Sequence, residues 1–270
     1  VTELAADGSD VRVGPDGRYG TYMVGGVEEP TIAIFELGDT AAVVSTFPGR
    51  SPTLSADGQV AFYRVGHTPE LESAVAEVAR ALQEADRAAW DRARAAVQWV
   101  EALNTTLWIR DIETGEERQV ALNGVFPVGM DFSPDGRTLF FTGGRLRGDR
   151  SNHVYAVQTD IAPMDEIQTD ELQTDVPRAA RLVSESVLAG EGFKVSPRIV
   201  SGGRYLLYVR PSRNPLPARP DGPGDSSDGA AGFALVDLQA GEVLDIEGTG
   251  PAVSASGDRL AFITERGERW

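Results

Sequence analysis

One pattern of twelve residues recurs, with variations, five times along this chain of 270 residues. Its fullest copy, F-S-P-D-G-R-T-L-F-F-T-G, runs from Phe132 to Gly143. In every copy an apolar residue stands four positions before the turn glycine, and an aromatic residue stands five positions after it. The glycines are Gly17, Gly58, Gly136, Gly203 and Gly257, preceded by Val13, Leu54, Phe132, Ile199 and Val253 and followed by Tyr22, Tyr63, Phe141, Tyr208 and Phe262. The chain therefore repeats one structural unit.

Each copy has the composition of a β-hairpin. Pro-Asp-Gly or Ala-Asp-Gly occupies the centre of the first three copies, where glycine tolerates a positive φ and aspartate can bond the backbone ahead of it. Gly202 and Ser256 replace the aspartate in the last two copies, which alters the turn but not the strand pattern. The predicted structural turn residues are Asp16 and Gly17, Asp57 and Gly58, Asp135 and Gly136, Gly203 and Gly257.

Further strand-like segments follow the hairpins, so the repeating unit has four antiparallel strands. Examples are residues 31–37 with 41–47, and residues 106–112 with 117–122. The first two turn glycines are 41 residues apart, whereas the later spacings are 78, 67 and 54. A four-stranded unit of ~40 to 45 residues is typical of a β-propeller blade, so the longer spacings indicate insertions.

The segment from Ser133 to Phe141, S-P-D-G followed by an apolar and aromatic strand, resembles the TolB-type propeller repeat. That repeat also occurs in the propellers of prolyl-oligopeptidase-like enzymes. We expect an all-β fold, a β-propeller of about five four-stranded blades in a single domain over residues 1–270. Pairing of Val1–Leu4 into the last blade would close the ring; the alternative is a truncated propeller of six or more blades.

Residues 68–104 interrupt the strand pattern with a helical one. Apolar residues advance by threes and fours through residues 69–103, Thr68 and Pro69 suit a helix start, and Asn104 suits a stop. Because the second and third strands of one blade lie close together, the insertion that joins them must return on itself, and we predict a helical hairpin bent at residues 84–86, with Asp86 capping the second helix. It is either a decoration packed on itself and the propeller or a docking arm, for which the predicted partner-binding residues are Trp90, Trp99, Arg87 and Arg94.

Two further insertions have loop compositions. Residues 160–178 form an acidic segment typical of a solvated surface loop, and residues 211–232 are rich in proline, glycine and aspartate. Asp225 and Asp228 are weak metal candidates, since their segment lacks the alternating oxygen ligands and closing glutamate of a calcium loop.

The sequence offers few groups for catalysis. It has no cysteine, only two histidines without a metal-binding spacing, no G-x-S-x-G elbow and no phosphate-binding glycine loop, so we predict no catalytic residue and no cofactor. The net charge of -16, with a pI of about 4.5, argues against nucleic acid as a partner. No apolar run reaches the ~20 residues that a membrane-spanning helix needs.

The lack of catalytic groups favours a non-enzymatic protein-binding or scaffold module, and the TolB resemblance implies that this module belongs to the bacterial cell envelope. The TolB resemblance implies a periplasmic or otherwise extracytoplasmic location and protein partners. An accessory subunit that stabilises a larger membrane-associated assembly, such as an energy-converting complex, fits the lack of catalytic groups and the three insertions. The sequence begins at Val1 and not at methionine, and its start lacks the charged and apolar regions of a leader, so we expect either that a leader has been removed or that the sequence starts inside a longer gene product. The alternatives are a hydrolase or ligand sensor using the central channel, or the non-catalytic propeller of a prolyl-oligopeptidase-like peptidase.

Overall fold

The computed structural model describes residues 8–25, 30–146, 152–159, 181–183, 185–188, 194–200, 203–211, 232–254 and 259–263. Within these residues the strands form five sheets. The first sheet contains β1 (Ser9–Val13), β2 (Tyr19–Val24), β3 (Thr31–Glu36) and β4 (Ala42–Pro48), paired in that order. The second contains β5 (Arg50–Leu54), β6 (Gln59–Val65), β7 (Thr105–Asp111) and β8 (Glu117–Ala121), with β12 (Arg181–Val183) added in parallel beside β8.

The remaining sheets repeat this antiparallel order. The third contains β9 (Val125–Phe132), β10 (Thr138–Arg145), β11 (Asn152–Gln158) and β13 (Glu185–Leu188). The fourth contains β14 (Val195–Val200), β15 (Tyr205–Arg210), β16 (Gly232–Asp237) and β17 (Val243–Ile246), and β18 (Thr249–Val253) pairs with β19 (Leu260–Ile263). Only one residue separates β12 from β13 in the sequence, and the two strands pair with β8 and β11, the outer strands of two neighbouring sheets.

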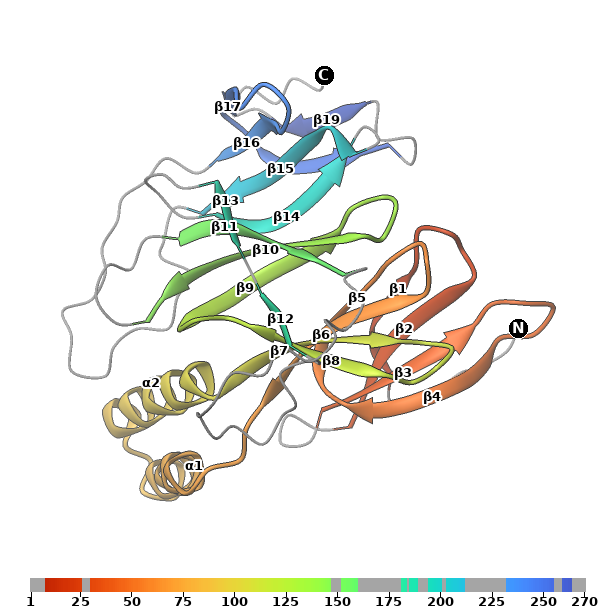
Figure 1. Ribbon diagram of the computed structural model, residues 1–270. Helices are drawn as coiled ribbons and strands as arrows, with labels where there is room; N and C mark the ends of the chain where they lie inside the picture. Colours follow the sequence, from red (N-terminus) through yellow and green to blue (C-terminus); the bar gives the residue numbers. More distant parts are fainter. Residues whose placement is uncertain are drawn as a thin grey trace, which may run out of the picture.

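The sheets follow one another in chain order, from β1–β4 to β18–β19 (Figure 1). The predicted all-β architecture of successive four-stranded units is confirmed. The residues of the pairing predicted for Val1–Leu4, the whole of the 160–178 insertion and residues 212–231 lie outside the described residues, so the blade number stays a prediction.

Apolar side chains on both faces of the sheets make the core. Phe47 of the first sheet contacts Phe62 of the second, with ring centroids 4.8 Å apart. Between the second and third sheets, Ile109 packs in one cluster with Phe141. Each side chain so buried stabilises the fold by about 1.5–3 kcal/mol, and a blade isolated from its neighbours would lose this contribution on both faces. The aromatic residues of the first four copies, Tyr22, Tyr63, Phe141 and Tyr208, are all buried.

The hairpin turns place their glycines at positive φ. Gly17, Gly58, Gly136 and Gly203 have φ between 70° and 94°, and Gly257 lies outside the described residues. Asp16 and Asp135 accept hydrogen bonds from the backbone N–H two residues ahead, at 3.0 and 3.2 Å. Asp57 instead accepts from the Ser55 hydroxyl and the Gln59 amide, at 2.5 and 3.0 Å.

A second recurrent feature is a residue with positive φ, seven positions before the turn glycine, on the first strand of a sheet. Asp10, Ser51 and Ser196 have φ near +50°, and Gly250 has φ +61°. The strand register shifts at each of these residues, which marks a β-bulge. Proline follows three of them in the sequence, and proline is tolerated at bulges because it has no N–H to donate to the ladder.

The insertion is a helical hairpin, as predicted, of α1 (Pro69–Gln83) and α2 (Arg87–Leu103). Thr68 accepts a hydrogen bond from the Leu71 N–H at the start of α1, and Asp86 accepts one from the Ala89 N–H at the start of α2. At the bend, Ala85 has φ +53°, and the N–H groups of Ala85 and Asp86 donate to the Leu82 and Ala81 carbonyls. This is a Schellman-type helix end with alanine at the position that glycine usually fills.

We predict that Ala85→Gly stabilises the protein by about 0.5–1 kcal/mol, because glycine adopts a left-handed conformation without the Cβ conflict that alanine meets. Chemical denaturation measures the change. Ala76→Gly, at an exposed position in the middle of α1, is the matched control and should destabilise by about 1 kcal/mol. A loss of stability in Ala85→Gly equal to that of the control would contradict the observed helix end.

Candidate functional site

The helical hairpin is fastened to the second sheet at its root. The Gly66 N–H donates to the Asn104 carbonyl at 2.9 Å, which holds the two ends of the insertion together. Arg50 of β5 lies 3.4 Å from the Glu101 carboxylate of α2, and the Thr105 hydroxyl donates to the Glu101 carbonyl at 2.8 Å. These contacts set the direction in which the hairpin leaves the sheets (Figure 1).

Beyond this root the two helices pack mainly on each other. Ala81 of α1 and Ala93 of α2 are buried, and small side chains permit a close approach of helices. Among the described elements, neither helix packs against a strand as extensively as it packs against the other helix. Three large apolar side chains of the hairpin stay exposed: Val75 at 42%, Leu82 at 62% and Leu103 at 43%.

Three of the predicted partner-binding residues come together near the bend. The guanidinium carbons of Arg87 and Arg94 lie 4.4 and 5.2 Å from the centroid of the Trp90 ring, which is partly buried. Arg87 is also 3.3 Å from the Asp91 carboxylate. Stacking on an indole orients a guanidinium and leaves its N–H edges available to carboxylates. We call Arg87, Trp90 and Arg94 the tip face.

Trp99 does not belong to the tip face. It lies nine positions after Trp90, which at about 100° per residue places the two side chains on opposite sides of α2. Trp99 is partly buried and precedes the buried Ala102 near the root. The two tryptophans therefore do not form one surface.

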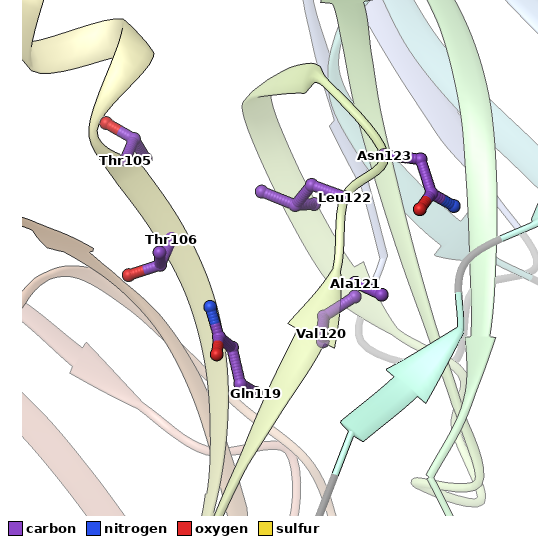
Figure 2. Close-up of a pocket in the computed structure, with 7 residues that line it drawn as sticks. All are labelled: Thr105, Thr106, Gln119, Val120, Ala121, Leu122 and Asn123. Atoms are coloured by element: carbon purple, nitrogen blue, oxygen red, sulfur yellow. The ribbon is translucent and has the colours of Figure 1, made fainter. Parts of the chain in front are cut away.

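A pocket of ≈ 200 Å³ lies beside the root, between the start of β7 and the end of β8 (Figure 2). Its lining residues are Thr105, Thr106, Gln119, Val120, Ala121, Leu122 and Asn123. The Thr106 hydroxyl donates to the Arg64 carbonyl at 3.2 Å and accepts from the Trp108 indole N–H at 2.9 Å. The lining contains no acid, no base and no thiol.

One carboxylate in the second sheet joins two arginines. The Glu117 carboxylate accepts hydrogen bonds from the guanidinium groups of Arg64 and Arg110, at 2.7 and 2.8 Å. Arg64 also donates a hydrogen bond to the Pro48 carbonyl of the first sheet, at 3.1 Å. Burial alone would raise the pKa of Glu117, but the bonds from the two arginines outweigh it and the pKa is lowered. This charged group therefore has a structural role, because its members bind one another and the neighbouring strand.

Asp131 of β9 joins two neighbouring sheets. Its carboxylate accepts a hydrogen bond from the Ile199 N–H of β14 at 3.1 Å. Burial raises the pKa of Asp131 to about 6, although this bond and the positive charges of Arg198 and Arg12 oppose the rise. Burial of the ionised Asp131 carboxylate therefore costs free energy, and this cost depends on pH.

We predict that the free energy of unfolding of Asp131→Asn rises relative to that of the wild type as pH increases. The folded pKa lies above the ordinary aspartate value, so the unfavourable contribution is absent near pH 3.8 and grows as pH rises through about 6. Asparagine keeps an acceptor for Ile199 but no charge, so the difference in the free energy of unfolding should shift by on the order of 2 kcal/mol between about pH 4 and pH 8. Denaturation across this range measures it, and a difference independent of pH would contradict the buried titration.

The other predicted residues form no further site in the described part of the chain. Asp225 and Asp228 lie outside it, and within it no group of three or more histidine, aspartate or glutamate side chains could hold a metal ion. No helix among the described residues is both long and apolar enough to cross a membrane.

Comparison with known proteins supports the fold. No protein-family model matches the sequence, and no curated protein matches it significantly. Solved structures do match: TolB from Acinetobacter baumannii has a TM-score of 0.55 at 15% identity, covering 97% of this chain and 53% of that one. A putative TolB from Agrobacterium tumefaciens has a TM-score of 0.55 at 15% identity, covering 97% and 77% respectively.

This chain has a TolB-like β-propeller fold. A further match is the β-propeller domain of the trilobed protease from Pyrococcus furiosus, with a TM-score of 0.53 at 13% identity, covering 96% of this chain and 64% of that one. The chain thus spans about half the length of the Acinetobacter protein and less than two thirds of the Pyrococcus domain. At such identities the likeness concerns the fold.

Proposed function

We propose that this TolB-like propeller is a non-enzymatic protein-binding module, and that the α1–α2 hairpin is its docking arm. The observation that carries the proposal is a helical hairpin fastened at its root and packed on itself, which presents an arginine-flanked tryptophan near its bend. Aromatic residues and arginine are enriched at protein interfaces, and the cores of such interfaces exclude water around them.

The propeller serves this function as a rigid support. Its sheets are interlocked by apolar side chains on both faces, so the strands on either side of the insertion, β6 and β7, are held in place. A binding element on such a support loses less conformational freedom on association than a free helix would.

For the cellular context we propose the bacterial envelope, with partners among the subunits of a membrane-associated complex. The support is the likeness to TolB structures, to which this chain is similar in fold at low identity. In this setting the chain is an accessory subunit that stabilises the assembly from the extracytoplasmic side.

Deletion of the arm tests the proposal. Residues 69–103 are replaced by a short glycine and serine turn, which the Gly66–Asn104 hydrogen bond permits because the ends already meet. We expect the tagged wild-type protein to retain partners from the native membrane fraction that the deletion variant loses, as measured by quantitative mass spectrometry.

Two point variants refine the test. Trp90→Ala should lose the same partners, whereas Trp99→Ala, on the opposite side of α2, is the matched control and should keep them. Circular dichroism and thermal denaturation establish that each variant is folded. Retention of every partner by the folded deletion variant would contradict the docking arm.

A further inference from the structure

The outer edge of the second sheet carries an additional strand. Among the described sheets this is the only one with five strands, and its fifth strand, β12, lies beside β8 (Figure 1). The pairing of β12 with β8 is parallel, whereas every other pair of described strands is antiparallel. β12 is therefore an addition to a complete four-stranded unit and does not belong to the repeat.

The ladder between β12 and β8 is short. Its residue pairs are Arg181–Gln119, Leu182–Val120 and Val183–Ala121. Parallel pairs are slightly less stable per residue than antiparallel pairs. One residue, Ser184, connects β12 to β13, the outer strand of the third sheet. This connection keeps β12 at a high effective concentration beside β8, which favours a pairing of so few residues.

The edge of β8 continues beyond β12 into the pocket beside the root of the hairpin. Pairing of β7 with β8 ends at Leu107, although β7 pairs with β6 as far as Thr105. The two strands then diverge, and the pocket of ≈ 200 Å³ lies between them (Figure 2). Leu122 and Asn123 line this pocket and follow Ala121, the last residue of β8 that pairs with β12. A longer strand on the same edge would therefore reach residues with which β12 does not pair.

The groups that this edge presents suit an extended chain. The N–H and C=O groups along the edge of a strand pair in succession with the main chain of another extended segment. The position of β12 shows that β8 accepts such a segment from outside the four-stranded unit. A helix is a poorer ligand for this edge, because its main-chain groups are already bonded within the helix.

We propose that the outer edge of β8 is a strand-addition site, at which an extended segment of a protein partner replaces β12 and continues over the pocket. Main-chain hydrogen bonds to residues 119–121 supply affinity, and contacts with Leu122 and Asn123 favour a partner that is longer than β12. Because the partner binds only those molecules in which β12 has left the edge, β12 lowers the partner's apparent affinity. The site does not include α1 or α2, so this inference does not rest on the docking arm.

Binding of a peptide copy of β12 tests the inference. The probe is a fluorescein-labelled peptide with the sequence of residues 178–186, R-A-A-R-L-V-S-E-S, and its binding is measured by fluorescence anisotropy. In the three-proline variant, Arg181→Pro, Leu182→Pro, Val183→Pro, β12 cannot donate hydrogen bonds to β8. We expect this variant to bind the peptide at least about tenfold more tightly than the wild type does. Ser226→Pro, Ser227→Pro, in an insertion already rich in proline, is the matched control and should bind like the wild type.

Three further measurements locate the peptide on the edge. A peptide with N-methylated leucine and valine should not bind, because its main chain cannot donate at these positions. A peptide that ends at the valine should bind more weakly, because it does not reach Leu122 and Asn123. In the wild type, saturating peptide should speed hydrogen exchange at the amides of β12 while the amides of β8 stay protected.

The inference is overturned if the folded three-proline variant does not bind the peptide, binds it no more tightly than the wild type, or binds the N-methylated peptide equally well. Circular dichroism establishes folding, and if the three-proline variant is unfolded, hydrogen exchange in the wild type decides. The outcome is separable from that of the docking arm. A protein that lacks residues 69–103 and carries the three prolines should still bind the peptide, whether or not the deletion removes the membrane-fraction partners.

Discussion

Packing of each sheet against its neighbours is the constraint on which the rest of this structure depends. A single four-stranded unit is apolar on both faces, so it gains most of its stability only when units stand on either side. Phe47 contacts Phe62 between the first and second sheets, and one apolar cluster contains both Ile109 of the second sheet and Phe141 of the third. The recurrence of one pattern along the chain follows from this constraint, because every unit must present compatible faces.

Polar contacts also connect neighbouring sheets. Glu117 binds two arginines, one of which reaches the Pro48 carbonyl of the preceding sheet, and Asp131 accepts a backbone hydrogen bond from the following sheet. The two carboxylates respond to their surroundings in opposite ways: arginines lower the pKa of Glu117, whereas burial raises that of Asp131. The contributions of these two carboxylates to stability are therefore expected to change with pH in different ways, whereas the apolar contacts between the sheets do not titrate.

The connections between strands can differ in length and structure while the sheets stay the same. The insertion between β6 and β7 needs only ends that meet, which the Gly66–Asn104 hydrogen bond provides. Its helices bury alanines against each other and thus do not need the propeller for most of their packing. An element with its own packing can take a role in binding without disturbing the sheets.

Much of this was predictable from local patterns. The spacing between apolar, glycine and aromatic positions predicts the hairpins, and the threefold and fourfold apolar spacing with Thr68 and Asp86 as caps predicts two helices and their bend. The β-bulges on the first strands of the sheets were not predicted, although the Ser-Pro pairs at Ser51 and Ser196 were a usable signal. The joining of Glu117 to Arg64 and of Asp131 to Ile199 could not be predicted, because these contacts depend on how strands distant in sequence are brought together.

Native-state hydrogen exchange tests the central claim, that stability comes from sheet-to-sheet packing while the arm is energetically separate. The account predicts that amides of β6 and β7 exchange only through opening with a free energy close to that of global unfolding, and that amides of α1 and α2 exchange through a local opening of clearly lower free energy. Equal opening free energies in the hairpin and in β6 and β7 would contradict it.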